Sequence, residues 1–121
     1  MVDDEQDVLD LFDDYLKSNG YNVLSFDSPI KALEYFYNNS DNCAIVITDY
    51  KMPQMSGLDF LKKIREKDVD CKIKTMIVSA YTKTEIPYEI SYIMKIDKIL
   101  EKPVYLDNLK EEIKKLTTTT I

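Results

Sequence analysis

Residues 45–57 read Ile-Val-Ile-Thr-Asp-Tyr-Lys-Met-Pro-Gln-Met-Ser-Gly. A run rich in β-branched side chains ends in a carboxylate, Asp49, and a turn closed by Pro53 and Gly57 follows it. This pattern predicts a strand over 44–48 that is buried on both faces. Open α/β sheets bind ligands at the carboxyl ends of their strands, so Asp49 is a candidate functional residue. Taken alone, an aspartate at such a position is more often a turn former or a helix cap.

The composition indicates one soluble globular domain of 121 residues, with 45% hydrophobic and 31% charged residues. The net charge of −6 and the pI of about 4.6 argue against non-specific binding to nucleic acid. No stretch has the length of a membrane span or the pattern of a signal peptide, so we expect a cytoplasmic protein. The absence of histidine excludes His-based triads and metal sites, and Cys43 and Cys71 alone predict no disulfide framework.

Apolar periodicity predicts strands that alternate with helices along the whole chain. The expected helices cover 7–19, 29–39, 58–67, 85–95 and 106–116, and the expected strands lie at 1–2, 22–26, 44–48, 75–79 and 99–101. Ser28 and Pro29 predict the cap and first position of the second helix. Its inward residues are expected to be Ile30, Leu33, Phe36 and Tyr37. Such alternation predicts a doubly wound parallel sheet covered on both faces. The domain is expected to span 1–117, and 118–121 to be a tail or the start of a linker.

Polar residues follow four of the expected strands and should meet at one edge of the sheet. They are the pair Asp3-Asp4, then Asp49, Ser79 and Lys102. Each has an ordinary structural reading on its own. The acid pair would be a frayed terminus, Ser79 a strand-end hydroxyl and Lys102 a surface lysine.

Four stretches together resemble the receiver domain of two-component response regulators. They are Asp3-Asp4-Glu5, Asp49 to Gly57, Val78-Ser79-Ala80 and Glu101-Lys102-Pro103. The resemblance covers nearly the whole chain and implies a flavodoxin-like sheet of five strands in the order 2-1-3-4-5. Only Met1 and Val2 precede the acids, so the first strand is expected to be unusually short. Its neighbouring strands would then be poorly paired, and pairing with a second chain, as in a homodimer, would supply the missing partners.

The resemblance implies that Asp49 accepts a phosphoryl group from a phosphohistidine on a histidine kinase or a histidine phosphotransfer protein. An aspartate is chemically able to hold phosphate as a mixed anhydride. Mg²⁺ is the implied cofactor because it prefers carboxylate and phosphate oxygens. The implied ligands are Asp4, Asp49, the backbone carbonyl of Lys51, and Asp3 through water.

Lys102 and the Ser79 hydroxyl are the implied contacts to the other phosphate oxygens, and a cis Lys102–Pro103 bond is implied to aim the lysine inward. Such a module promotes only its own phosphotransfer and dephosphorylation, so we do not expect an enzyme in the usual sense. Phosphorylation in the family changes the face formed by the fourth helix, fifth strand and fifth helix.

The chain departs from the family pattern at two further places. Ile99 stands where the family has an aromatic residue that turns during switching, which leaves Tyr81 and Tyr92 as nearby candidates for that role. Lys95-Ile96 replaces a small pair, which predicts a looser turn before the last strand.

Other readings remain open at this level. A degenerate receiver would serve only as an interaction surface, and Ile99 and the short start favour it. An aspartate-nucleophile phosphatase of the haloacid dehalogenase type needs a second aspartate where Lys51 stands. A flavodoxin lacks support because no Ser/Thr/Gly-rich phosphate loop follows the first strand. No output domain is visible in the sequence, so the chain is expected to be a stand-alone regulator or part of a larger one.

Overall fold

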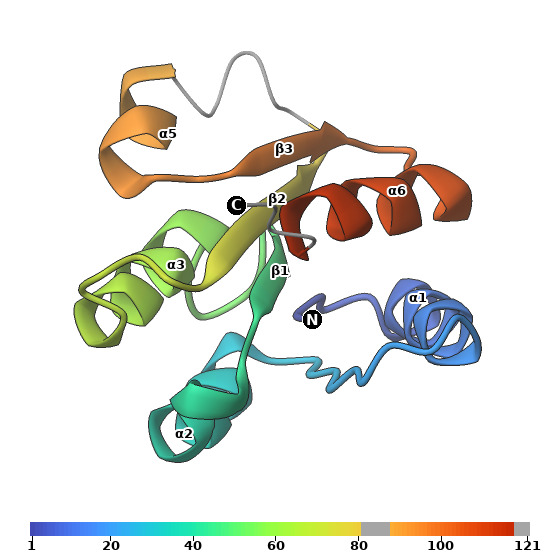
Figure 1. Cartoon of the computed structure of the whole chain (residues 1–121), viewed down its shortest axis with the longest axis horizontal. Coiled ribbons are helices and arrows are strands. Elements are labelled where there is room, and N and C mark those ends of the chain that lie inside the picture. The colour runs from blue at the N-terminus through green and yellow to red at the C-terminus, as the bar shows by residue number, and fades with distance from the viewer. Residues whose placement is uncertain (81–87, 118–121) are drawn as a thin grey trace.

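A computed structural model describes residues 1–80 and 88–117 and shows helices around a parallel sheet (Figure 1). The strands are β1 (Ile45–Asp49), β2 (Lys74–Ser79) and β3 (Lys98–Glu101). The helices are α1 (Gln6–Ser18), α2 (Pro29–Asn39), α3 (Gly57–Lys67), α5 (Tyr88–Met94) and α6 (Leu106–Thr117), with a short 3₁₀ helix at Ser40–Asn42. The predicted alternation is therefore confirmed over the described residues, and the start of the helix expected at 85–95 lies outside them.

The strands pair in parallel in the order β1-β2-β3. Val46 lies opposite Thr75, and Ile77 lies opposite Ile99. Four residues of β1 and five of β2 are buried, as expected for central strands covered on both faces.

The continuous strand expected at 22–26 is wrong within the described part of the chain. Val2 makes single parallel bridges to Phe26 and Thr48, and no longer ladder forms there. A strand at 22–26 needs a neighbour of its own length, and only Met1 to Asp3 lie beside it. Three of the five expected strands are therefore formed, so the five-stranded order is not confirmed.

The helices cover both faces of the sheet, as Figure 1 shows. One core cluster packs against α2 and α3 and includes Phe36, Phe60 and Ile64. The other packs against α1 and α6 and includes Phe12 and Leu109. Helices on both faces of a parallel sheet confirm the predicted α/β class with a sheet covered on both sides.

The cap predicted for the second helix is confirmed. Ser28 accepts a hydrogen bond from the Lys31 amide at the start of α2, and Pro29 occupies the first helical turn. Ile30 and Tyr37, predicted to point inward, are 41% and 43% exposed. Leu33 and Phe36, also predicted to point inward, are buried, and Ala32 completes the buried stripe of α2.

The turn between α5 and β3 is held by hydrogen bonds from Arg65 and Thr75. That this turn is looser than the one usual in the family stays a prediction. The Arg65 guanidinium donates to the carbonyls of Met94 and Lys95 at 3.4 and 2.8 Å. Thr75 donates from its hydroxyl to the Lys95 carbonyl and from its amide to Asp97. Lys95 itself adopts a φ of 52°.

Both cysteines are free thiols. Among the described residues, no helix combines the length and the apolar character that crossing a membrane requires.

Candidate functional site

Asp49 is the last residue of β1 and is 8% exposed. Its Oδ1 accepts a hydrogen bond from the Tyr50 amide at 2.8 Å, and its Oδ2 lies 3.3 Å from the Lys102 ammonium. The carboxylate is therefore fixed by its own backbone on one side and faces a cation on the other.

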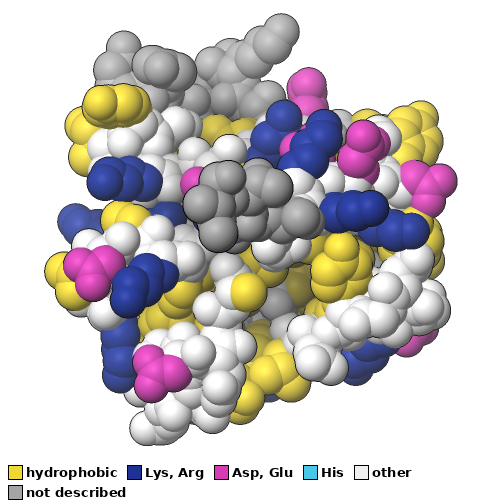
Figure 2. Space-filling model, in the orientation of Figure 1, with side chains coloured by type: hydrophobic (Ala, Val, Ile, Leu, Met, Phe, Trp, Pro, Cys, Tyr) yellow, Lys and Arg dark blue, Asp and Glu magenta, His cyan; other side chains and the backbone are white. Residues whose placement is uncertain are grey.

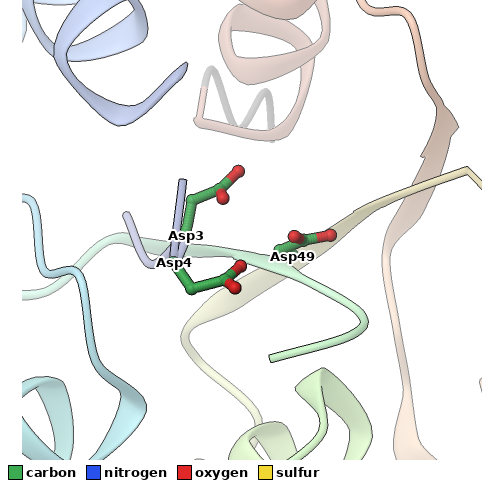
Figure 3. A group of neighbouring side chains, drawn as sticks. All are labelled: Asp3, Asp4 and Asp49. Carbon is green, nitrogen blue, oxygen red and sulfur yellow. The ribbon is translucent and has the colours of Figure 1, made fainter. Parts of the chain in front are cut away.

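Two further acids reach the same place because Val2 bridges to Thr48, one residue before Asp49. Asp3 is 2% exposed and accepts a hydrogen bond from the Glu5 amide at 2.9 Å, whereas Asp4 is exposed. One carboxylate oxygen from each of Asp3, Asp4 and Asp49 lies within 4.8 Å of the others (Figure 3). The structure thus brings together the three acids that the sequence placed at one sheet edge.

Lys102 follows β3 and supplies the positive charge at this edge. Its amide donates to the Ser79 carbonyl at 2.8 Å, which ties the lysine to the end of β2. Its ammonium lies 3.7 Å from Asp3, 3.3 Å from Asp49 and 3.9 Å from Glu5. The Lys102–Pro103 peptide bond is cis, as the resemblance implied.

The electrostatics of the group follow from burial and crowding. Burial raises the pKa of Asp49 above its usual value, and Lys102 offsets this only in part. Burial also raises the pKa of Asp3, and the nearby Asp49 adds to the effect. Burial by itself would lower the pKa of Lys102, but Asp3 and Asp49 outweigh it, so the pKa of Lys102 is raised. Asp3 and Asp49 therefore ionise less readily than a free aspartate, chiefly because they are buried.

For Ser79 and Lys51, the structure gives the position and the exposure of each residue. Ser79 ends β2, is 1% exposed and lies opposite Glu101 in the register. Lys51 is exposed in the loop after β1. The roles assigned to the Ser79 hydroxyl and the Lys51 carbonyl stay predictions.

Gly57 matters for a reason that the sequence did not reveal. A Cβ at this position would lie 2.3 Å from the Asp49 carbonyl oxygen and 3.1 Å from the Tyr50 Cα. The Gly57 amide donates to the Tyr50 carbonyl at 2.6 Å. The start of α3 can therefore fold back onto the end of β1 only without a side chain here. Glycine in a turn signal was visible in the sequence, but this close approach was not.

Glu5 was also missed as a member of the site. It was noted only as part of the acidic start, yet its carboxylate approaches Lys102 and its amide orients Asp3.

The donor set fits a small divalent cation. Three carboxylates converge, and two of them are almost withdrawn from water, where their mutual repulsion is screened least. Mg²⁺ is usually bound through one or two carboxylates together with waters and phosphate oxygens. The exposed Asp4 leaves one side of the group open to solvent.

The family model of the response regulator receiver domain matches residues 1–114, and the chain belongs to this family. A cyclic di-GMP phosphodiesterase of Thermotoga maritima is 31% identical over 113 residues, which cover 93% of this chain and 29% of that protein. The two-component response regulator ORR11 of Oryza sativa subsp. indica is 35% identical over 91 residues, covering 74% of this chain and 59% of the regulator. The chain thus spans less than two thirds of either relative.

Solved structures agree with this assignment. A response regulator receiver domain protein from Clostridium thermocellum is 27% identical, with a TM-score of 0.85 and coverage of 96% of this chain and 90% of that one. The response regulator TrrA from Thermotoga maritima, solved in complex with Mg²⁺–BeF, is 32% identical, with a TM-score of 0.79 and coverage of 95% and 94%. The fold of this chain is the CheY-like receiver fold.

Proposed function

We propose that this chain is a phosphoacceptor module that takes a phosphoryl group onto Asp49 with the help of Mg²⁺. The observation that carries the proposal is the convergence of Asp3, Asp4 and Asp49 within 4.8 Å, with the Lys102 ammonium 3.3 Å from Asp49. A nucleophilic carboxylate, a cation site and a fixed ammonium are the groups that phosphoryl transfer to aspartate requires.

The transfer starts from a phosphohistidine on a partner protein. A carboxylate oxygen of Asp49 attacks the phosphorus, the P–N bond breaks, and its electron pair stays on the histidine nitrogen. The product is an acyl phosphate on Asp49. Water later attacks the phosphorus, the P–O bond to the carboxylate breaks, and inorganic phosphate leaves. Such a module turns over only its own phosphoryl group, which is why we do not class it as an enzyme.

The position of each residue at the site determines its role in the transfer. Asp49 provides the nucleophile, and its Tyr50 amide contact keeps the carboxylate oriented. Lys102 lies where its ammonium can follow the charge from the carboxylate to a phosphate oxygen. Asp4, Asp49 and the Lys51 carbonyl would hold Mg²⁺, with Asp3 acting through water, and the bound ion would supply positive charge beside the carboxylates. The Mg²⁺–BeF complex of TrrA supports this choice of metal.

Acetyl phosphate is a small donor that tests the proposal without a kinase. Intact-mass measurement with Mg²⁺ should show a gain of one phosphoryl group, and Asp49→Asn should abolish it. Asp59→Asn is the matched control because Asp59 is an exposed aspartate on α3. If wild type gains no phosphoryl group from acetyl phosphate or from a phosphohistidine donor, the chain is an interaction module only.

The output of the module is proposed to be the face formed by α5, β3 and α6. Ile99 lies on β3, half-buried against the α2–α3 core cluster. Of the two alternative aromatic candidates, Tyr92 is 74% exposed on α5 and Tyr81 lies outside the described residues. A half-buried isoleucine has no ring to move, so we expect a smaller rearrangement of this face than an aromatic would produce.

The remaining parts of the proposal rest on the family. The partners are a histidine kinase or a histidine phosphotransfer protein, and the compartment is the cytoplasm. The bridges from Val2 to Phe26 and to Thr48 support the sheet order 2-1-3-4-5. Activities of the longer relatives do not transfer, because the chain matches only 29% and 59% of their lengths.

A further inference from the structure

Arg65 on α3 joins three parts of the chain at the edge of the sheet where β2 and β3 begin. Its side chain is 13% exposed. Its Nη1 donates to the Ile73 carbonyl at 2.7 Å and to the Asp68 carboxylate at 2.8 Å. Its Nη2 lies 3.7 Å from the carboxylate of Asp97, which precedes β3. Two acids and a carbonyl therefore fix the guanidinium without any contribution from α5.

The same guanidinium caps α5 at its C-terminal end. The Arg65 Nε donates to the Met94 carbonyl at 3.4 Å, and its Nη2 donates to the Lys95 carbonyl at 2.8 Å. The Thr75 hydroxyl donates to the same Lys95 carbonyl at 3.1 Å. The last carbonyls of a helix have no partner within the helix, so a donor from another element can take that place. Here the donor comes from α3, and Figure 1 shows this end of α5 on the side of α3.

Lys95 adopts a backbone conformation that depends on these contacts. Its φ of 52° lies in the left-handed region, which residues with a side chain seldom occupy. Its amide donates to the Tyr92 carbonyl at 3.2 Å, and the Ile96 amide donates to the Ser91 carbonyl at 3.0 Å. A strained residue persists only where its surroundings hold it in place. The bonds from α3 and β2 to the Lys95 carbonyl supply that hold.

The packing of α5 is strongest at the same end. Met94 and, after the turn, Ile96 pack against the core cluster of α2 and α3. Ile90, Tyr92 and Ile93 are 37%, 74% and 76% exposed, and Figure 2 shows hydrophobic side chains at the surface over the region of α5. Isolated helices shorter than about 12 residues are marginal in water. The 7 residues of α5 are therefore stabilised mainly by the attachment of its C-terminal end.

We propose that Arg65 is a positioning residue of the output face: it fixes the C-terminal end of α5, and α5 moves by tilting about the turn at Lys95. The proposal rests on the proposed function, in which phosphorylation changes the face formed by α5, β3 and α6. A helix that is free at both ends can slide along the sheet. A helix whose last carbonyls are bonded to a neighbouring element keeps that end in place, so the start of α5 moves furthest.

Amide hydrogen exchange in the unphosphorylated protein tests the anchor. Arg65→Lys keeps the positive charge but loses the planar fork that reaches two carbonyls at once. The Ile96 amide should then exchange about tenfold faster, while the amides of β2 keep their rates. Lys67→Gln is the matched control, because Lys67 lies on the same helix and donates to the Tyr37 carbonyl on α2 instead. This control should leave the Ile96 amide unchanged.

A second variant tests the same turn without altering the guanidinium. Thr75→Val removes the other donor to the Lys95 carbonyl and keeps the size of a fully buried side chain. It should also speed exchange of the Ile96 amide, and it decides the question if Arg65→Lys does not fold. Equal acceleration of all amides would show that the network stabilises only the fold as a whole, and an unchanged Ile96 amide would show that it does not hold the turn. Either result overturns the proposal.

Residual dipolar couplings test the pivot, because they report the orientation of each amide N–H bond relative to the sheet. The wild-type chain is kept phosphorylated with excess acetyl phosphate and Mg²⁺, and its intact mass is measured in the same sample. The couplings from Ile90 to Met94 should change together, while those of Ile96 and Asp97 keep their resting values. In Arg65→Lys, the couplings of Ile96 and Asp97 should change as well.

The outcomes separate the pivot from the proposed function. In a phosphorylated sample, constant couplings along α5 exclude a tilt, and a change at Ile96 as large as that in α5 excludes a pivot at this turn. A sample that gains no phosphoryl group refutes the proposed function and with it the pivot, while the exchange result on the anchor stands.

Discussion

Gly57→Ala should damage the protein at the junction between β1 and α3. The added methyl carbon would stand 2.3 Å from the Asp49 carbonyl oxygen and 3.2 Å from the Asp49 carbonyl carbon. These neighbours are backbone atoms of a buried strand, so they cannot rotate away as a side-chain end would. The short hydrogen bond from the Gly57 amide to Tyr50 must lengthen as well.

The cost can be estimated from these contacts. Forcing a methyl group into a packed region costs about 1–3 kcal/mol, and weakening one hydrogen bond adds about 1 kcal/mol. Alanine gives the unfolded chain less conformational entropy than glycine does, and this stabilises the folded state by about 0.5 kcal/mol. The net loss is about 1.5–3.5 kcal/mol, which lowers the Tm of a domain of this size by about 10 °C.

Thermal and urea unfolding measure this loss, and acetyl phosphate labelling measures its effect on the site. A shift of about half an ångström at Asp49 should slow labelling about tenfold. Gly20→Ala is the control, because Gly20 has a φ of 90° but nothing within 4 Å of an added Cβ. That variant should lose about 1 kcal/mol through backbone strain and label normally. If Gly57→Ala melts and labels like wild type, the close approach that explains the loop geometry does not exist.

Three more predictions concern the charges at the site. Millimolar Mg²⁺ should raise the Tm by about 5 °C if it reaches ten times its Kd, and Asp49→Asn should lose most of this gain; an unchanged Tm would count against the acidic site. Lys102→Ala should impair phosphorylation or switching more than stability, and normal labelling and switching in that variant would remove Lys102 from the site. In metal-free buffer, the raised pKa values of Asp3 and Asp49 mean that the folded state binds protons more readily than the unfolded chain. This stabilisation is complete below the unfolded pKa and is lost as pH rises through the folded pKa, so Asp49→Asn should gain stability relative to wild type between about pH 4 and pH 7. Urea unfolding across this range measures the difference in free energy of unfolding between Asp49→Asn and wild type. A difference that does not change with pH would contradict the raised pKa of Asp49.

The meeting of the acids with Lys102 could be predicted from the sequence because strand ends are marked locally. A β-branched run followed by a turn marks Asp49 as the end of β1, and similar runs mark Ser79 and Lys102. In a parallel sheet, these ends must lie at one edge whatever the details of packing. The convergence of the acids with Lys102 therefore follows from the strand order and not from any single side chain.

The features that the sequence missed depend on contacts between distant segments. The segment 22–26 has the composition of a strand, but a ladder also needs a partner of equal length, and Val2 alone bridges to it. Periodicity on α2 could not distinguish Ile30 from Ala32, because the buried stripe is set by what α2 packs against. Arg65 reaches the carbonyl of Lys95, 30 residues later in the chain, which no local pattern indicates.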